Sequence, residues 1–261
     1  MRLDLYLAGK QLAESRTKAL DTIKKGNVKV NSKIVTKPSF DVGENDTVEL
    51  CEEKYRYVSR AAEKLVFAKE EFGIDFDGLV GVDLGASTGG FCQVMLEGNI
   101  KELFAVDIGH GQLHKEVAKD NRVRVLEGVN ARYIDESHIG KKADIVTADL
   151  SFISQTLVFE AITRILKPGG IYIGLIKPQF EAGRENIGKH GIVKYKKVHV
   201  DVIEKVVCSA NLFGLVNKGL AVSPILGGDG NKEFLAYYVF EGISGETPSK
   251  EKITRLVTND G

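Results

Sequence analysis

The sequence predicts an α/β protein in which a mostly parallel sheet with helices on both faces is preceded by a small α+β domain. Three observations support this fold class. Short apolar runs alternate with helix-like segments over residues 60–241, which is typical of a parallel sheet covered by helices. A glycine-rich turn follows an apolar run at residues 85–90. The first 50 residues have another pattern, short helices and a hairpin, so we expect a separate domain there.

Charge is unevenly distributed along the chain. The 261 residues carry no net charge, and 28% of them are charged, as expected of a globular protein with one larger and one smaller domain. Residues 1–37 contain nine Lys or Arg and three acids, a net charge of +6, whereas residues 38–53 contain six acids and no Lys or Arg. A basic block of this kind is typical of a polyanion binder, although a solvated helix face would give the same pattern.

Some classes of site are disfavoured by the sequence. The cysteines are Cys51, Cys92 and Cys208, without a Cys-x-x-Cys pair, so we expect neither a zinc site nor disulfides. His110 and His114 have helical spacing but no third ligand nearby, so no metal site is expected. No apolar run approaches the roughly 20 residues of a membrane span, and no signal-peptide core is evident. We therefore expect a soluble, cytoplasmic protein that binds neither metal nor membrane.

Residues 1–50 are expected to form the small domain. Ser15 can cap a helix whose apolar residues recur at helical spacing, and Gly26 ends that helix. A hairpin and a further strand follow, so cations of the helix and of the hairpin can gather on one surface. The expected elements are a helix beginning at Leu3, a helix over 16–25, a hairpin over 28–35 and a strand over 47–50.

The rest of the chain is expected to consist of a linker over 51–59, an α/β domain over 60–241 and a polar C-terminal tail over 242–261. The domain begins with a helix over 60–72, where apolar residues repeat at spacings of three and four. Strands are expected at 79–84, 102–106, 123–126, 144–148, 171–176, 215–222 and 233–240. Further helices are expected at 94–97, 112–119, 155–166 and 198–212, and a short one after Pro248.

The most informative stretch is residues 81–91, where an apolar strand carries Asp83 and breaks at Gly85. Glycines let the backbone turn with positive φ and let a ligand come close. No Gly-Lys-Ser/Thr follows, which excludes a Walker-type loop. A turn of this kind beside an acid suits a ligand with hydroxyls and an amine, such as S-adenosylmethionine, although dinucleotide-binding folds use similar turns. The residues expected to contact the cofactor here are Asp83, Gly85, Ala86, Ser87, Thr88, Gly89, Gly90 and Phe91.

Four consecutive strands are followed by an ionisable residue, namely Asp107, Glu127, Asp149 and Lys177. One such acid could simply cap a helix, but four in succession at one sheet edge indicate a pocket. We expect Asp107 to accept hydrogen bonds from ribose hydroxyls, and Glu127 and Asn130 to flank an adenine ring. Ile108 and Asp149 are expected to line the same cofactor site.

Lys177 is a candidate for catalysis because it follows a mainly apolar strand. Desolvation favours the neutral form of an amine, and such a lysine can orient or deprotonate a hydroxyl. Asp149 could pair with it and hold it in place. Lys64 and Glu233 carry no comparable signal, so from the residues alone they are interpreted as surface charges.

The N-terminal segment resembles the S4-type RNA-binding domain. The matching residues are Arg2-Leu3-Asp4, Ser15-Arg16, Ala19, Ile23, the run Gly-Asn-Val-Lys-Val-Asn at 26–31 and Val-Thr-Lys-Pro at 35–38. The resemblance implies RNA binding that reads shape and phosphates and depends strongly on salt. The residues expected to contact RNA are Arg2, Arg16, Lys18, Lys24, Lys25, Lys29, Lys33 and Arg60.

Motifs spread over residues 1–240 resemble the TlyA or hemolysin A family of S4-containing ribosomal RNA methyltransferases, which have an FtsJ-like catalytic domain. They include Tyr-Val-Ser-Arg at 57–60, Asp-Leu-Gly-Ala-Ser-Thr-Gly-Gly-Phe at 83–91, Ser-Phe-Ile-Ser at 151–154, Lys-Pro-Gln-Phe-Glu at 177–181 and Ser-Pro-Ile at 223–225. The resemblance implies a Rossmann-like fold of the class I methyltransferases, with S-adenosylmethionine as the cofactor.

The resemblance also implies a catalytic tetrad for methylation of a ribose 2′-oxygen, which maps onto Lys64, Asp149, Lys177 and Glu233. The implied substrate is a cytidine in ribosomal RNA, either free or within ribosomal subunits. Two alternatives stay open at this point. One is an inactive protein that only binds ribosomal RNA. The other is a hemolysin, which would need an amphipathic or membrane-spanning segment that is not evident in the sequence.

Overall fold

The structure is a computed structural model that describes residues 1–10, 12–13, 15–24, 26–43, 45–50, 57–228 and 230–258. The chain forms two compact units, Met1–Arg56 and Tyr57–Gly261. Among the described residues, the first unit has one hydrophobic core, and the second has two, which lie on opposite faces of its sheet.

The first unit packs two short helices against a three-stranded antiparallel sheet with the strand order β2-β1-β3. Leu7 and Ile23 from the helices and Val28 and Val30 from the central strand are buried in its core. The order of elements is the one that the sequence predicts. The bounds are α1 (Leu3–Gly9), α2 (Arg16–Lys24), β1 (Val28–Val30), β2 (Lys33–Ile34) and β3 (Val48–Leu50).

A buried carboxylate ties the start of α1 to the start of α2. The Asp4 side chain has no exposed surface, and it accepts hydrogen bonds from Arg2 Nε at 2.9 Å and from Arg16 Nε at 3.0 Å. These hydrogen bonds lower the pKa of Asp4 to about 2, and the bond from Arg2 has the largest effect. Asp4 is therefore an anion that links the two helices of this unit.

The second unit is built on a seven-stranded sheet with the strand order β6-β5-β4-β7-β8-β10-β9. Strands β4 to β8 are mutually parallel, and β10 is antiparallel to both β8 and β9, so the predicted mostly parallel sheet is confirmed. The strand order reverses at β4, and ligands of open sheets bind beyond the carboxyl ends at such a point. The strands are β4 (Val80–Leu84), β5 (Glu102–Asp107), β6 (Val123–Glu127), β7 (Ala143–Ala148), β8 (Leu166–Ile176), β9 (Leu215–Val222) and β10 (Phe234–Phe240).

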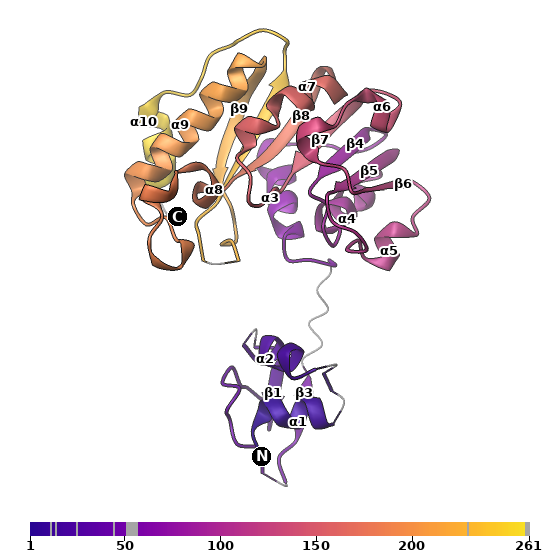
Figure 1. The fold of residues 1–261 in the computed structure, drawn as a ribbon, viewed down its shortest axis with the longest axis vertical. Coiled ribbons are helices and arrows are strands. Elements are labelled where there is room, and N and C mark those ends of the chain that lie inside the picture. The colour runs from indigo at the N-terminus through magenta and orange to yellow at the C-terminus, as the bar shows by residue number, and fades with distance from the viewer. Residues whose placement is uncertain are drawn as a thin grey trace. The chain divides into compact units, whose positions relative to one another are not determined.

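Helices cover both faces of this sheet (Figure 1), because successive residues of a strand point to opposite faces. In β5, Phe104 and Val106 belong to one core, whereas Leu103 and Ala105 belong to the other. The first core is covered by α6 (Glu136–Ile139), α7 (Phe159–Ile165), α9 (Lys196–Leu212) and α10 (Lys250–Thr258). The second core is covered by α3 (Ala62–Phe72), α4 (Gly90–Glu97) and α5 (Lys115–Ala118).

Strand β8 and the C-terminal segment of the second unit depart from their predicted descriptions. Strand β8 begins at Leu166, five residues earlier than expected, because Leu166 already pairs with Ala143 of β7 across an irregular register. Segment 242–261, expected to be a polar tail with a short helix after Pro248, contains that helix as α10. Ile253 and Val257, one turn apart on α10, are buried in the core beside α9, so this segment is part of the second unit up to residue 258.

The expected linker over 51–59 is shorter at its C-terminal end. The backbone N–H of Val58 donates to Gln93 Oε1 of α4 at 2.8 Å, and Ser59 lines a cavity of the second unit. Residues 57–59 therefore belong to that unit. Residues 51–56 lie outside the described part of the chain.

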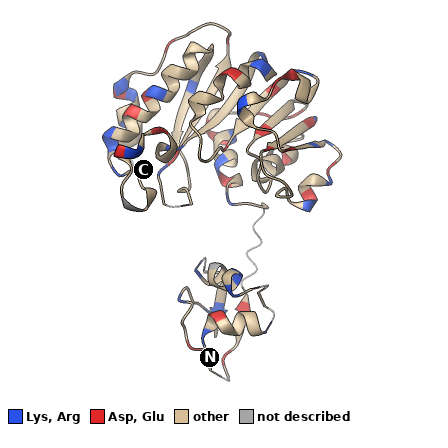
Figure 2. Cartoon of the chain, viewed as in Figure 1, with Lys and Arg blue, Asp and Glu red and all other residues tan. Residues whose placement is uncertain are grey.

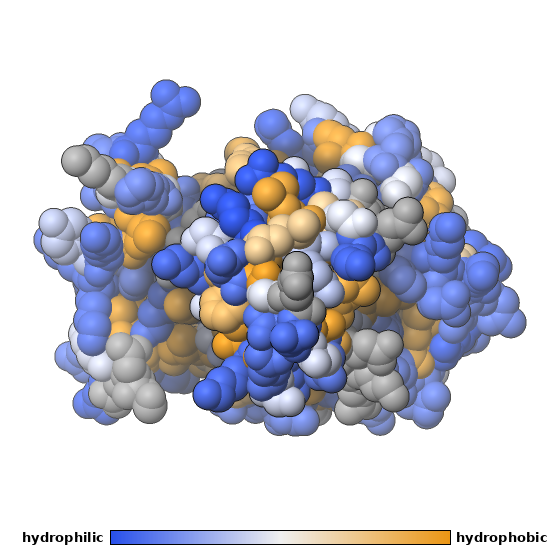
Figure 3. All heavy atoms as spheres, turned by 90° about the horizontal axis from the view of Figure 1, so that it is seen from below, coloured by the Kyte–Doolittle hydropathy of each residue, from blue (hydrophilic) through white to orange (hydrophobic). Residues whose placement is uncertain are grey.

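The face in Figure 3 is mostly hydrophilic, with smaller hydrophobic areas between the polar side chains. Among the described large apolar side chains, Phe152 is the most exposed, at 91%. None of the helices in the described ranges combines the length and the hydropathy that a transmembrane span requires.

We predict that acid destabilises the first unit through Asp4. Its pKa is about 2 in the folded unit and about 4 in an unfolded chain. The stabilisation is therefore complete above about pH 4 and is lost as the pH falls towards 2. Hydrogen exchange of the α1 and α2 amides, measured between pH 5 and pH 2, should show this loss in the native protein. Asp4→Asn should reduce the loss, whereas Asp41→Asn, which changes an exposed carboxylate, should not; equal acid sensitivity in Asp4→Asn would contradict the prediction.

Candidate active site

The glycine-rich turn after β4 forms the floor of a cavity of about 180 Å³. Gly85 and Gly89 have φ angles of +80° and +94°, a backbone region that favours glycine. A β-carbon at Gly89 would lie 2.8 Å from Leu113 Cδ1, and one at Gly90 would lie 3.0 Å from Ser59 Cβ. The turn therefore depends on its glycines. The cavity is lined by Ser59, Ala61, Asp83, Gly85, Ala86, Ser87, Thr88, Gly90, Phe91, Asp149, Ser151 and Lys177.

A second cavity, of about 460 Å³, adjoins the first and shares Gly85, Ser87, Asp149 and Ser151 with it. Its walls are mostly apolar, with polar groups at a few points, which is typical of a small-molecule site. It is lined in addition by Val106, Asp107, Ile108, Gln112, Val129, Asn130, Ala131, Leu150, Phe152 and Ile153.

The acids at the strand ends occupy different places around these cavities. Asp107 accepts hydrogen bonds from the backbone N–H groups of Ser87 at 2.8 Å and Gly109 at 2.7 Å, so it holds the glycine-rich turn while it lines the larger cavity. Asn130 lines the same cavity. Glu127 does not line that cavity; it lines a small hollow that shares Ser87, Asp107 and Gln112 with it.

Asp83 lies beneath the turn with 1% of its surface exposed. Burial raises the pKa of Asp83 to about 7, although hydrogen bonds from Thr147 and Cys92 act in the opposite direction. Thr147 Oγ1 donates to Asp83 Oδ1 at 2.8 Å, and Cys92 Sγ donates to Oδ2 at 3.2 Å. Asp83 thus changes its charge near neutral pH, at the wall of the smaller cavity.

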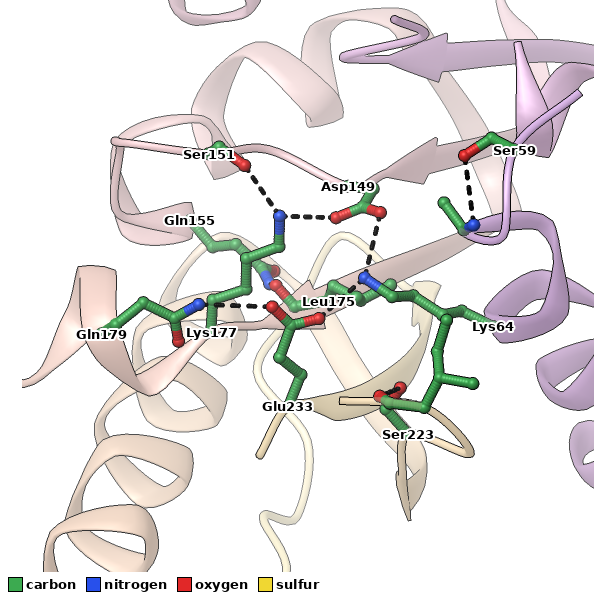
Figure 4. Close-up of polar contacts among 12 residues, drawn as sticks. Ser59, Lys64, Asp149, Ser151, Gln155, Leu175, Lys177, Gln179, Ser223 and Glu233 are labelled. Carbon is green, nitrogen blue, oxygen red and sulfur yellow. Dashed lines mark hydrogen bonds and ion pairs between the residues drawn. The ribbon is translucent and has the colours of Figure 1, made fainter. Parts of the chain in front are cut away.

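The structure brings together the four residues Lys64, Asp149, Lys177 and Glu233 (Figure 4). Lys64 Nζ lies 3.2 Å from Asp149 Oδ2 and 2.7 Å from Glu233 Oε2. Lys177 Nζ lies 2.6 Å from Asp149 Oδ1. Lys64 comes from α3, Asp149 and Lys177 follow β7 and β8, and Glu233 directly precedes β10. Two cations and two anions therefore form a continuous chain of ion pairs.

These ion pairs are largely shielded from water. Lys64, Lys177 and Glu233 are 6%, 7% and 2% exposed. Burial by itself raises the pKa of Asp149, but attraction to Lys177 and Lys64 outweighs it and holds that pKa below its ordinary value. Asp149 is therefore an anion that keeps two buried ammonium groups in fixed positions.

Three side chains of this site were not predicted. Ser151 Oγ accepts a hydrogen bond from Lys177 Nζ at 2.9 Å, and Gln179 Nε2 donates to Glu233 Oε1 at 3.3 Å. The Phe180 ring lies 5.9 Å from Lys177 Nζ, within the range of a cation–π contact. Each of them is within three residues of a predicted residue, and all three lie in the motifs at 151–154 and 177–181 that carry the family resemblance.

Lys and Arg lie on helices and on strands of the first unit (Figure 2). The residues predicted to contact RNA differ in exposure and in partners. Arg2 and Arg16 bind Asp4 and are about half exposed, so part of their role is structural. Lys18, Lys24 and Lys33 are exposed, and Lys29 is partly buried. Arg60 is exposed in the second unit, and Lys25 lies outside the described residues.

The two histidines with helical spacing do not form a metal site with each other. His114 Nδ1 accepts the backbone N–H of Glu116 and so caps α5, and His110 Nδ1 lies 3.7 Å from Glu127 Oε2. Within the described ranges, no group of three or more His, Cys, Asp or Glu side chains is arranged to hold a metal ion.

Comparison with known proteins gives matches to both units. The profile of the FtsJ-like methyltransferases matches residues 57–240, and that of the S4 domain matches residues 1–48. The chain is 39% identical to YqxC of Bacillus subtilis over 98% of this chain and 92% of that protein. It is 36% identical to the 16S/23S rRNA (cytidine-2′-O)-methyltransferase TlyA of Mycobacterium tuberculosis, over 90% and 88% of the two chains.

A solved structure has the same fold over nearly the whole length. A protein described as a hemolysin from Streptococcus thermophilus superposes with a TM-score of 0.79 at 39% identity, covering 98% of this chain and 94% of that one. Both units thus have relatives with the same domain order. The chain therefore belongs to the FtsJ-like methyltransferases and, with its N-terminal S4 domain, to the TlyA and hemolysin A group within that family.

Proposed function

We propose that this protein transfers the methyl group of S-adenosylmethionine to the 2′-oxygen of a cytidine in ribosomal RNA. The observation that carries the proposal is the position of Lys177. Its ammonium group is fixed between Asp149 and Ser151 and lines the cavity above the glycine-rich turn. An amine in that position can meet a hydroxyl beside a ligand that occupies the turn.

The two adjoining cavities fit S-adenosylmethionine. The positive φ angles of Gly85 and Gly89 turn the backbone tightly at the smaller cavity, and glycine leaves room for a ligand that lies against the backbone. We infer that the larger cavity takes the adenosine. There Asp107 would accept bonds from the ribose hydroxyls, and Ile108 and Asn130 would contact the ring. The smaller cavity, with Asp83 at its wall, would take the methionine part.

The tetrad would act mainly by orientation. Bound S-adenosylmethionine supplies a methyl group on a sulfonium, which is a good leaving group. Lys177 makes an ion pair with Asp149 and a hydrogen bond to Ser151, which leaves a third N–H to hold the ribose hydroxyl in line. As the oxygen–carbon bond forms and the carbon–sulfur bond breaks, the hydroxyl would become strongly acidic and its proton could pass late to water, so fixed geometry would supply most of the acceleration.

Lys64 and Glu233 would support this geometry from the other side of Asp149. Lys64 bridges the two carboxylates, so it would keep Asp149 ionised and aimed at Lys177. Gln179 adds a hydrogen bond to Glu233. We infer that Lys64 also helps to position the nucleotide, because the ammonium groups of Lys64 and Lys177 both pair with the carboxylate of Asp149.

We propose that the first unit docks the RNA. The S4 match and the net charge of +6 over residues 1–37 support this, because cations that neutralise phosphates provide most of the sequence-independent affinity. The rRNA specificity printed for TlyA of Mycobacterium tuberculosis supports ribosomal RNA, or subunits, as the partner. A substrate of that kind implies action in the cytoplasm.

Lys177→Ala is predicted to abolish methyl transfer and to leave RNA affinity nearly unchanged, because the substitution removes the orienting amine without touching the first unit. Transfer of a labelled methyl group to ribosomal RNA and RNA binding by filter retention measure the two effects. Lys167→Ala, at the other end of β8, is the matched control and should keep activity. Equal loss of both properties would make Lys177 an RNA-binding residue, and no transfer by the native protein would favour the inactive RNA-binding alternative.

The joint replacement of Lys18, Lys29 and Lys33 by Gln is predicted to weaken RNA binding and to reduce its salt dependence. Each lost phosphate contact lowers the slope of log K against log salt by roughly 0.7–0.9, so the slope should fall by about 2. The control replaces the exposed Lys101, Lys218 and Lys252 of the second unit. S-adenosylmethionine affinity should not change in either variant. An unchanged slope in the first variant would show that its three lysines do not contact phosphates.

Affinity for S-adenosylmethionine is predicted to rise between pH 6 and pH 8. Asp83 has a pKa of about 7, so it is mostly protonated below that value and mostly anionic above it. A ligand with a sulfonium and an ammonium binds the anionic form more tightly. Calorimetric titrations across this range should show the increase, and Asp83→Asn should make the affinity nearly independent of pH. A native affinity that does not vary with pH would contradict the role given to Asp83.

A further inference from the structure

Glu181 is a buried carboxylate that the mechanism above does not use. It ends α8 (Pro178–Glu181), the short helix that begins directly after Lys177, and only 5% of it is exposed. Its Oε2 accepts the Ser154 hydroxyl at 2.5 Å, and its Oε1 accepts the backbone N–H of Gln155 at 2.7 Å. Both oxygens are thus directed at one point of the chain, the end of the loop that follows Asp149.

That loop, residues 150–155, carries side chains of the site. Ser151 Oγ contacts Lys177 Nζ at 2.9 Å, and Leu150 to Ile153 form a wall of the larger cavity. Phe152 has a φ angle of +65°, a conformation that costs energy for a side chain of this size. A loop with such a residue keeps its shape only if both of its ends are held. Asp149 holds the first end.

Gln155 anchors the second end to β8 as well. Its Nε2 donates to the Leu175 carbonyl, and its Oε1 accepts the Tyr172 hydroxyl at 2.8 Å. Gly174 makes room for this contact, because a β-carbon there would lie 2.5 Å from Gln155 Oε1. The loop end is therefore fixed to the strand before Lys177 by Gln155 and to the helix after Lys177 by Glu181.

We propose that Glu181 is a positioning residue for methyl transfer. It binds the end of the 150–155 loop and so fixes Ser151 Oγ beside Lys177 Nζ. The inference rests on the proposed function, since it needs Lys177 to act on the substrate hydroxyl. Glu181 touches neither the ligand cavities nor Lys177 among the described contacts, and it acts only through the loop.

Burial of the carboxylate supports a specific role. Burial raises the pKa of Glu181, and the bonds from Ser154 and Gln155 offset part of that effect. An unpaired carboxylate at this depth would be costly. The two loop contacts, together with attraction to Lys205, stabilise the carboxylate of Glu181 there. The chain has an exposed glutamate one turn further on, Glu185, which offers a matched comparison.

The test is a double-mutant cycle between Glu181 and Ser151, measured as the single-turnover rate of methyl transfer with saturating S-adenosylmethionine and RNA. Glu181→Ala is expected to lower the rate about tenfold, and Ser151→Ala by a similar factor. The double variant should be no more than about twofold slower than the slower single variant. Both substitutions disrupt the same feature, the placement of Ser151 Oγ beside Lys177 Nζ, so their effects should not multiply. Glu181→Gln should stay within about threefold of the native rate, since its amide oxygen can still accept the Gln155 N–H. Glu185→Ala should match the native protein.

Losses that multiply, to about a hundredfold in the double variant, would overturn the proposal, because independent effects are the mark of a general structural role. A native rate in Glu181→Ala would also overturn it. If that variant does not fold, as judged by its circular dichroism and melting, Ser154→Ala removes the same contact from the loop side and replaces it in the cycle. Failure of the proposed function is distinguishable, because the native protein itself would then transfer no methyl group.

Discussion

The carboxylate of Asp149 is the point on which the site depends. It pairs with Lys177 through one oxygen and with Lys64 through the other. Without it, two largely buried ammonium groups would face each other with only Glu233 to balance them. Breaking a buried ion pair by removing one partner costs about 3–5 kcal/mol. The four charged residues should therefore behave as a unit, and the loss of one should disturb the positions of the others.

The fold explains how residues so far apart in the sequence meet. Asp149 and Lys177 follow the adjacent parallel strands β7 and β8, so they lie at the same sheet edge. Strand β10 pairs antiparallel with β8, and its first residue lies opposite Ile176, which brings the preceding Glu233 to that edge. Lys64 reaches the same edge from α3, whose apolar side packs against one face of the sheet. The turn that carries the proposed cofactor site lies at the end of the neighbouring strand β4.

The sequence predicted the elements whose patterns are local. The alternation of strands and helices gave the mostly parallel sheet, and the strand-end rule indicated Asp149 and Lys177. Lys64 and Glu233 were indicated only by family resemblance, since a contact across 169 residues leaves no local pattern. The role of Asp4 was missed because only the fold shows that Arg2 and Arg16 both donate hydrogen bonds to it. The helix after Pro248 was predicted, whereas its packing in the core through Ile253 and Val257 was not, because the segment around these two residues is polar.

The central claim is that a charged tetrad beside the glycine-rich turn directs a methyl group onto a ribose oxygen. It is tested most directly by incubating the purified protein with ribosomal subunits and S-adenosylmethionine that carries an isotopically labelled methyl group. The RNA is then digested to nucleosides and analysed by mass spectrometry. The account predicts labelled 2′-O-methylcytidine. Label on a nucleobase, or no label in any nucleoside, would contradict it.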